Sequence, residues 1–241
     1  ERLRLNPTEM RSTNIAKTLT GDLVRVLAAR INEHAKDVDA IFMPAVVGLD
    51  GCSDVVRLKE YVDRPLHFLS TLPPSVPGIR LQLMLKRYFQ KLGGTYMLGD
   101  SVTGGVFEGD RLKAVITRNH EDFRFEADNF ILASGSMFSK GLVSDMDTVR
   151  EPVFGLDVDF LAGRSRWYDK NIFEAQPYMT FGVSVGKDFH VLRNGICVAN
   201  LYAAGSVLSG FNALKEGSGA GVSILTALHV SSLILNAAIT S

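Results

Sequence analysis

The sequence predicts an α/β fold in which a parallel sheet with an antiparallel meander follows a smaller α+β region. Residues 201–204 form a short apolar strand that ends in Gly205, and a long apolar helix follows this strand after a loop. Residues 129–135 form a second apolar run, which ends in the small residues Ala-Ser-Gly. Because a strand that leads through a loop into a helix is typical of parallel sheets, we expect both strands in one such sheet.

The first third of the chain predicts helices and one strand. Apolar residues recur at helical spacing over residues 14–35, and residues 39–48 predict a buried strand followed by a loop. A further helix is expected to begin near Asp54. Three prolines in residues 71–78 argue against regular structure there. We therefore place a domain boundary after residue 75, which divides the chain into residues 1–75 and 76–241.

The second domain is expected to open with an amphipathic helix over residues 79–92 and a strand over residues 93–99. Residues 104–117 then predict a β-hairpin, with Glu108-Gly-Asp as the turn. Residues 123–128 alternate apolar and polar side chains, as a half-exposed strand does. Together these segments predict the meander.

Glycines near the C-terminus indicate a binding site. Gly205 ends the last strand, and Gly217, Gly219 and Gly221 open the helix. Glycine permits close approach of a ligand, and the first-turn N–H groups of a helix supply partial positive charge. A dinucleotide or a flavin is the usual occupant, although glycines that serve packing alone are the alternative. The predicted cofactor-binding residues are Ala133, Ser134, Gly135, Gly205, Ser206, Val207, Gly217, Ser218, Gly219, Ala220, Gly221 and Val222.

This order of elements is that of the C-terminal part of a two-dinucleotide-type (Rossmann-like) flavoprotein. Such proteins open with a strand, a Gly-x-Gly-x-x-Gly motif and a helix, and this motif is absent from the sequence. The chain begins with Glu1 rather than Met. We therefore expect a C-terminal fragment that lacks the phosphate-binding unit and is inactive alone.

Residues 220–239 are apolar and about as long as the ~20 residues that a membrane-spanning helix requires. They also contain His229 and several hydroxyl side chains, and no positive charges flank them. We expect a helix buried in protein on nearly all sides rather than a membrane span.

Composition excludes several other classes. The 241 residues include 26 basic and 26 acidic side chains, so the charge balance gives no sign of nucleic-acid binding. Cys52 and Cys197 are far apart, which argues against a disulfide scaffold, a zinc site or an iron–sulfur cluster. We expect no metal site.

Four segments together resemble one known family. They are residues 133–144, residues 150–158 with the block Arg-Glu-Pro-Val-Phe-Gly-Leu-Asp, residues 176–183, and the C-terminal glycine-rich segment. In order and spacing they resemble the B subunits of the bacterial anaerobic glycerol-3-phosphate dehydrogenases. The resemblance covers about the last two thirds of the chain.

The resemblance implies a flavin-carrying subunit of a complex that oxidises glycerol 3-phosphate to dihydroxyacetone phosphate and passes electrons to the quinone pool. It implies FMN as the cofactor, with FAD as the other choice. The implied partners are a second flavoprotein subunit and an iron–sulfur, membrane-associated subunit, which would hold the protein in the cytoplasm at the inner membrane. It also implies that residues 1–75 form a cap or substrate-side region and that residues 142–190 contain an insertion.

Glycerol 3-phosphate requires cations for its phosphate and a base near its alcohol. The available side chains are Arg80, Arg150, Arg164, Arg166, His67, His190 and His229. Taken singly, each is more often an ordinary surface or packing residue. Arg150 and His190 are our candidates, and Arg150 comes first because it belongs to the Arg-Glu-Pro block.

Two alternatives remain open. One is a flavoprotein of the fumarate-reductase or aspartate-oxidase type that acts on another small acid or amine. The other is an electron-relay or assembly subunit without substrate chemistry of its own.

Overall fold

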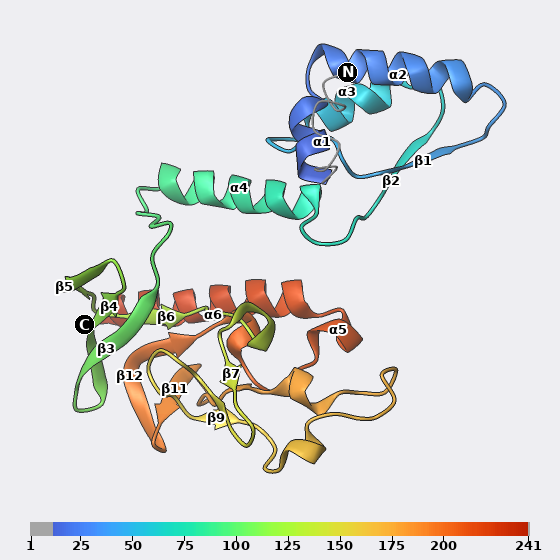
Figure 1. The fold of residues 1–241 in the computed structure, drawn as a ribbon. Helices are drawn as coiled ribbons and strands as arrows, with labels where there is room; N and C mark the ends of the chain where they lie inside the picture. Colours follow the sequence, from blue (N-terminus) through green and yellow to red (C-terminus); the bar gives the residue numbers. More distant parts are fainter. Residues whose placement is uncertain (1–11, 241) are drawn as a thin grey trace. The chain divides into compact units, whose positions relative to one another are not determined.

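The computed structural model describes residues 12–240, apart from the side chain of the last of these. The chain divides into two compact units, Glu1–Leu98 and Gly99–Ser241. Figure 1 shows their elements.

Unit 1 is a small α+β structure. In chain order its elements are α1 (Ser12–Thr18), α2 (Asp22–His34), β1 (Ile41–Pro44), α3 (Ser53–Tyr61), β2 (Leu66–Leu69) and α4 (Val76–Lys91). Strands β1 and β2 are parallel, with Ile41 opposite Leu66. Helices α2 and α3 bury Val24 and Leu58 completely in one core. This apolar core holds the unit together.

Three predictions for this unit need correction. The helix expected over residues 14–35 is broken, because Gly21 adopts a φ of 54° between α1 and α2. Strand β1 alternates half-buried and exposed residues instead of being buried throughout, because it pairs only with β2. The proline-rich segment also ends earlier than expected. Helix α4 begins at Val76, where Ser75 Oγ accepts a hydrogen bond from the N–H of Gly78 at 3.2 Å.

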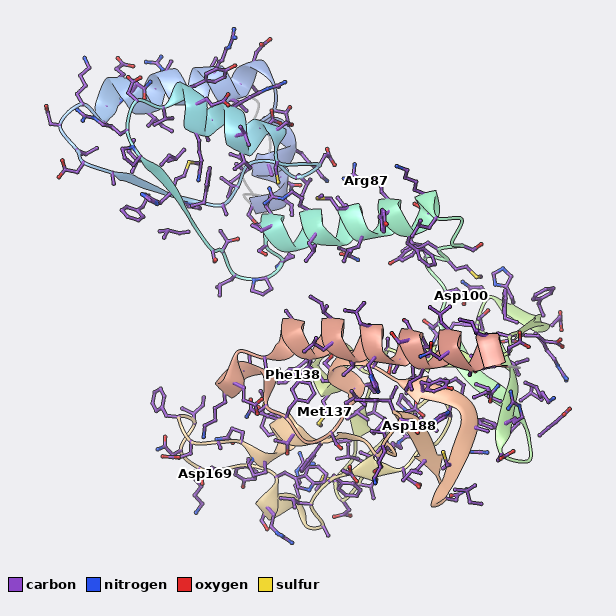
Figure 2. The ribbon with its side chains drawn as sticks, turned by 180° about the vertical axis from the view of Figure 1, so that it is seen from behind. Arg87, Asp100, Met137, Phe138, Asp169 and Asp188 are labelled. Atoms are coloured by element: carbon purple, nitrogen blue, oxygen red, sulfur yellow. The ribbon has the colours of Figure 1, made fainter. Side chains whose placement is uncertain are left out.

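The boundary between the units lies after Leu98 rather than after residue 75. Helix α4 explains the difference, because it is bound to unit 1. Arg80 Nη1 donates to the carbonyl of Gly48 at 2.7 Å, and Arg87 Nη2 donates to the carbonyl of Asp50 at 2.8 Å. Figure 2 labels Arg87 on this helix.

Unit 2 contains two three-stranded sheets. The antiparallel meander consists of β3 (Val102–Glu108), β4 (Arg111–Thr117) and β5 (His120–Glu126). The second sheet has the order β11-β12-β6, from β6 (Phe130–Leu132), β11 (His190–Arg193) and β12 (Ile196–Ala203). Strands β6 and β12 are parallel, with Leu201 opposite Phe130.

The hairpin with its turn at Gly109 and the parallel pairing of the two apolar strands are therefore confirmed. The predicted strand over residues 93–99 is wrong, since these residues form no strand. Within residues 12–240 the parallel part of this sheet is limited to β6 and β12, so a complete Rossmann-type sheet is not seen.

Short elements join these sheets. They are η1 (Met137–Ser139), β7 (Val143–Ser144), β8 (Val149–Arg150), β9 (Val158–Asp159), η2 (Arg164–Arg166), η3 (Pro177–Thr180), β10 (Gly182–Val183), η4 (Gly205–Val207) and α5 (Ala213–Glu216). The last element is α6 (Gly219–Thr240). A core that includes Leu112, Leu142, Val183 and Leu201 packs beneath the loops.

The side chain of Asn200 joins the two sheets of unit 2. It is 2% exposed. Its Oδ1 accepts the N–H of Leu112 at 2.9 Å, and its Nδ2 donates to the carbonyls of Leu112 and Asp128 at 2.8 and 2.9 Å. Strand β12 is thereby tied to β4 and to the segment that leads into β6.

Glu151 explains part of the Arg-Glu-Pro block. It is 2% exposed, and its carboxylate accepts the N–H groups of Val153 at 2.8 Å and Phe154 at 2.7 Å. These bonds shape the loop that follows β8. Arg150, by contrast, is exposed.

Helix α6 is not buried on nearly all sides, as the sequence had led us to expect. Figure 1 shows it along one side of unit 2. Thr226 and Val230 are buried against the unit, whereas Leu225, Leu228 and Leu235 are each more than half exposed. By length and composition alone α6 also qualifies as a membrane span, with 11% of its apolar window buried. Unit 2 covers only one stripe of the helix, and therefore most of its apolar surface is open.

We predict that Asn200→Ala lowers the free energy of unfolding by about 2–4 kcal/mol, because backbone groups of Leu112 and Asp128 lose buried partners. Urea denaturation measures this change. Asn129→Ala, at an exposed position just before β6, is the matched control and should change stability by less than about 0.5 kcal/mol. Equal losses in both variants would contradict the role given to Asn200.

The carboxylate of Asp100, near the start of unit 2, forms hydrogen bonds with the turn between β4 and β5. Asp100 has a side chain that is 6% exposed, and its Oδ2 lies 2.9 Å from His120 Nδ1. Hydrogen bonds from the Thr117 hydroxyl first, and then from His120 and the N–H groups of Asn119 and Ser101, hold the pKa of Asp100 well below its usual range. Figure 2 labels Asp100 near the meander.

This lowered pKa predicts acid sensitivity. The folded pKa lies below the unfolded value of about 3.9, so ionised Asp100 stabilises the fold above about pH 5 and loses this effect as pH falls. The difference in unfolding free energy between the wild type and Asp100→Asn should therefore shrink between about pH 5 and pH 3. Asp122→Asn, at an exposed position of β5, is the control. A wild-type advantage that stays constant over this range would contradict the prediction.

Candidate functional site

Unit 2 contains a large cavity beside the free edge of β6. Its volume is about 870 Å³, within the range of sites for small molecules and cofactors. The walls come from β3, β4 and β6 and from the loops that follow β6 and β8. Ala133 and Ser134, two predicted cofactor-binding residues, belong to the lining.

Polar groups in this cavity suit an anionic ligand. Its lining includes Arg118 and Lys140 and contains no carboxylate side chain from the described part of the chain. The hydroxyl oxygen of Ser134 is buried and has no hydrogen-bond partner among the described residues. A buried hydroxyl without a partner is costly, and a ligand atom that bonds to it removes this cost. The donor set therefore fits a phosphate-bearing group that continues into a less polar part.

A second, smaller cavity of about 300 Å³ lies beside the loop after β6. Ser206, from the predicted site, lines it together with Phe138, Tyr178 and Leu214. Its walls come from three segments that are far apart in the sequence: η1, η3 and the η4–α5 region.

Two glycines bring the predicted segments together. Gly135 has a φ of 85°, and a Cβ placed on it would lie 2.0 Å from Ser139 Oγ and 3.6 Å from Ser206 Oγ. Gly205 has a φ of 76°, and its N–H donates to Thr226 Oγ1 at 2.9 Å. These positions require glycine, because other residues rarely adopt such φ values. Residues 133–135 and 205–207 thus meet at the cavities.

The third predicted segment, residues 217–222, lines neither cavity. Gly217 ends α5 in the left-handed conformation, with a φ of 63°. Gly219 begins α6, and a Cβ on it would lie 3.3 Å from the Cβ of Ala213, which does line the smaller cavity. The start of α6 therefore adjoins the smaller cavity through α5.

The candidate catalytic residues lie elsewhere. Arg150 is exposed and interacts with Asp145, and it lines neither cavity. His190 pairs with Tyr202 across β11 and β12, with ring centroids 4.1 Å apart. Arg164 donates to the carbonyl of Asp145 at 2.8 Å, and the exposed His229 packs on Phe189.

The remaining candidates are one residue of unit 2 and two residues of unit 1. Arg166 is on the surface in η2. Arg80 and His67 belong to unit 1, where His67 stacks on Phe42. Within unit 2, the structure therefore does not bring the candidate cations and imidazoles to the two cavities; these candidates are Arg150, Arg164, Arg166, His190 and His229.

Several residues that line the two cavities were not predicted from the sequence. Arg118 was missed because nothing in the sequence places the turn after β4 beside the loop that follows β6. Lys140 was missed although it lies on that loop, shortly after Ser134. Met137 and Phe138 directly follow the Ala-Ser-Gly-Ser segment, so the sequence could have indicated them as lining residues. Figure 2 labels both on the same loop. Within residues 12–240 no group of three His, Cys, Asp or Glu side chains comes together as a metal site.

A strand that leads into Ala-Ser-Gly and a parallel neighbour that leads into Ala-Gly both end beside these cavities, which agrees with a cofactor-binding domain. The sequence model of the FAD binding domain matches residues 5–222, and the chain belongs to this family.

Curated relatives make the comparison more specific. The B subunit of the anaerobic glycerol-3-phosphate dehydrogenase of Pectobacterium carotovorum is 44% identical over 98% of this chain. The proteins of the same name from Yersinia enterocolitica and Haemophilus influenzae are each 40% identical over 98%. The resemblance inferred from the sequence is thus confirmed. The chain spans 56% of the length of these relatives. No solved structure matches the chain significantly.

The family match also bears on the cofactor. It supports a flavin, and FAD most directly. The choice of FMN over FAD finds no support.

We predict that Gly135→Ala destabilises unit 2 by about 1–3 kcal/mol, through its positive φ and the approach to Ser139. Thermal or urea unfolding measures the loss. The double variant Gly135→Ala/Ser139→Gly should regain only the stability lost through the steric contact with Ser139, because the strain of the positive φ at residue 135 remains. Full recovery would mean that φ is unimportant here, and no loss in the single variant would contradict the tight approach.

Proposed function

We propose that the chain is part of the flavin-binding subunit of an anaerobic glycerol-3-phosphate dehydrogenase, which oxidises glycerol 3-phosphate to dihydroxyacetone phosphate. The cavity lined by Ser134, Arg118 and Lys140 is the single observation that carries the flavin role. The buried hydroxyl of Ser134 has no hydrogen-bond partner among the described residues. The curated relatives, which are named as the B subunit of this enzyme, support the substrate.

The residues of this chain have distinct parts in holding the cofactor. Ser134, Arg118 and Lys140 would bind the phosphate-bearing part of FAD. The backbone at Gly135 and Gly205 permits close approach. The bound flavin supplies the redox chemistry, since its ring accepts and returns electrons.

The partners and the location form part of the same proposal. Electrons would leave through a second flavoprotein subunit and an iron–sulfur, membrane-associated subunit toward the quinone pool, and the complex would lie in the cytoplasm at the inner membrane. The word "subunit" in the names of the relatives supports an assembly of several chains. We also propose that unit 1 acts as the cap or substrate-side region and that residues 142–190 are an insertion in the flavin domain.

A second candidate function is electron relay or assembly without substrate chemistry. The position of Arg150 and His190 outside both cavities favours it. The two functions are separated when glycerol 3-phosphate is added to the isolated flavin-loaded protein. Bleaching of the flavin supports the dehydrogenase, whereas no bleaching with intact flavin content supports the relay. Turnover on dicarboxylates instead would support a relative of fumarate reductase.

The flavin proposal is tested through Ser134→Ala. We expect the stability of the ligand-free chain to stay within about 1 kcal/mol of the wild type or to rise, because the hydroxyl has no partner among the described residues. We expect FAD affinity to fall about tenfold, which corresponds to the loss of one good hydrogen bond. Equilibrium dialysis with mass identification of the flavin measures both binding and cofactor identity.

The control for this variant is Ser136→Ala, which changes a hydroxyl in the smaller cavity only. It should leave the binding of the phosphate-bearing part of FAD unchanged, as measured by competition with ADP. Unchanged FAD affinity in Ser134→Ala, or absence of flavin binding in the wild-type chain, would overturn the assigned cofactor role.

The start of α6 gives an independent test. A Cβ on Gly221 meets no atom within 4 Å, so Gly221→Asp should fold normally, and an acidic residue in the first turn of a helix is favourable. If residues 217–222 stabilise negative charge on reduced flavin, this variant should lower the flavin reduction potential relative to Gly221→Asn. A redox titration measures it. Equal potentials in the two variants would remove the cofactor role of this turn.

A further inference from the structure

The loop between η2 and η3 displays apolar side chains to solvent. Tyr168, Ile172 and Phe173 are 53%, 80% and 94% exposed, and Met146, in the turn between β7 and β8, is 72% exposed. We call these four residues the insertion patch, because they lie within the proposed insertion of residues 142–190. Among the described residues, the four neither belong to the core of unit 2 nor pack against it. The fold of unit 2 therefore does not explain them.

The loop that carries the patch is ordered by its own polar side chains. Gln176 Oε1 accepts the N–H of Asp169 at 2.9 Å, and Gln176 Nε2 donates to the carbonyls of Asn171 and Glu174 at 3.0 and 3.2 Å. Asn171 Oδ1 accepts the N–H of Phe173 at 3.1 Å. Figure 2 labels Asp169 on this loop. The backbone beneath the exposed Phe173 ring is thus held in one conformation.

The turn that displays Met146 adjoins the start of this loop. Arg164 Nη1, in η2, donates to the carbonyl of Asp145 at 2.8 Å. The carboxylate of Asp145 accepts the N–H groups of Asp147 and Thr148 at 3.0 and 2.8 Å, which orders the turn. The two segments of the insertion patch are therefore joined and preorganised. An ordered surface of this kind loses little conformational entropy when it binds.

We propose that the insertion patch binds another protein subunit of the enzyme, one that presents an apolar recess bordered by cations. Exposed aromatic and aliphatic side chains on an ordered loop supply most of the binding energy when a partner covers them. The charges select the partner. Residues 145–174 contain four cations and, apart from the buried Glu151, six carboxylates. This excess of carboxylates favours a partner with a basic rim and disfavours the anionic surface of a bilayer.

This inference rests on the proposed function, because the assembly of several chains is part of that proposal. It goes further by assigning the contact to the insertion and by giving the chemistry of the surface that it meets. The names of the curated relatives, which call them subunits, support the existence of such a partner.

The test measures binding of the 241-residue chain to two purified proteins in separate arms. These are the second flavoprotein subunit and the iron–sulfur subunit of the Pectobacterium carotovorum enzyme, whose B subunit is 44% identical to this chain. We expect the wild type to bind one of them, and Ile172→Ser and Phe173→Ser each to weaken this binding about tenfold or more. The matched controls are Ile196→Ser and Phe123→Ser, at residues that are 63% and 60% exposed and outside the patch. Both controls should bind as the wild type does.

A charge variant tests the basic rim of the partner. Glu174 is exposed and follows Phe173 directly. Glu174→Lys should weaken the association severalfold and reduce its dependence on salt, because one attraction to the rim is lost and a repulsion is added. Glu121→Lys, at an exposed position of β5, is the control and should change neither. Stronger binding of Glu174→Lys would contradict the basic rim.

Other occupants of the patch would give different results. Self-association of the chain, seen in sedimentation and abolished by Phe173→Ser, would overturn the inference in favour of a second copy. Binding to vesicles of phosphatidylglycerol that Phe173→Ser abolishes would overturn it in favour of a lipid surface. Failure of the wild type to bind either subunit, full affinity in both patch variants, or equal losses in the controls would overturn it as well.

Flavin measurements separate this inference from the proposed function. FAD content and bleaching by glycerol 3-phosphate are followed in the same variants, and we expect both to match the wild type. A chain that binds a subunit through the patch but holds no flavin would leave the interface standing while the proposed function fails. Intact flavin chemistry without subunit binding would overturn the interface alone.

Discussion

The side-chain amide of Asn200 is the constraint on which the geometry of unit 2 depends. Its three hydrogen bonds join β12 to β4 and to the segment before β6, so the parallel pair and the meander are fixed together. Because Asn200 is buried, a backbone group that loses its hydrogen bond to this side chain cannot bond to water instead. The ends of β6 and β12, where the predicted binding segments begin, take their positions from this junction.

The two cavities lie beside the strand ends that this junction positions. Gly135 and Gly205 turn the chain sharply at the strand ends, and Ser206 comes close to Gly135 as a result. One cavity is lined by two cations and by Ser134, whose buried hydroxyl has no partner among the described residues, and the other has neutral, largely aromatic walls. A cofactor with a phosphate-bearing part and a flat ring combines these two chemistries, which agrees with membership of the FAD binding domain family.

The Arg-Glu-Pro block shows how a specific motif can serve structure. Its arginine was the candidate for phosphate binding, yet Arg150 is exposed and Glu151 is the buried member. Glu151 satisfies the backbone N–H groups of Val153 and Phe154. A buried carboxylate that accepts backbone hydrogen bonds specifies a loop conformation, and a motif can be distinctive for that reason alone.

The sequence by itself determined the local elements, namely the hairpin at Gly109, the apolar strands and the last helix, because hydrophobic period and turn chemistry are local properties. It also located Ser134, Gly135 and Gly205, whose small side chains indicate a close approach. Only the tertiary structure decided that Arg118 and Lys140 share a cavity with Ser134 and that Phe138 and Tyr178 share another. Arg118 and Ser134, like Phe138 and Tyr178, are distant in the chain, and their proximity depends on how the segments of unit 2 pack. Tertiary packing likewise decided that only one stripe of α6 is buried. The hydrophobicity of a helix indicates that its apolar side chains favour burial, but it does not identify the surface against which they pack.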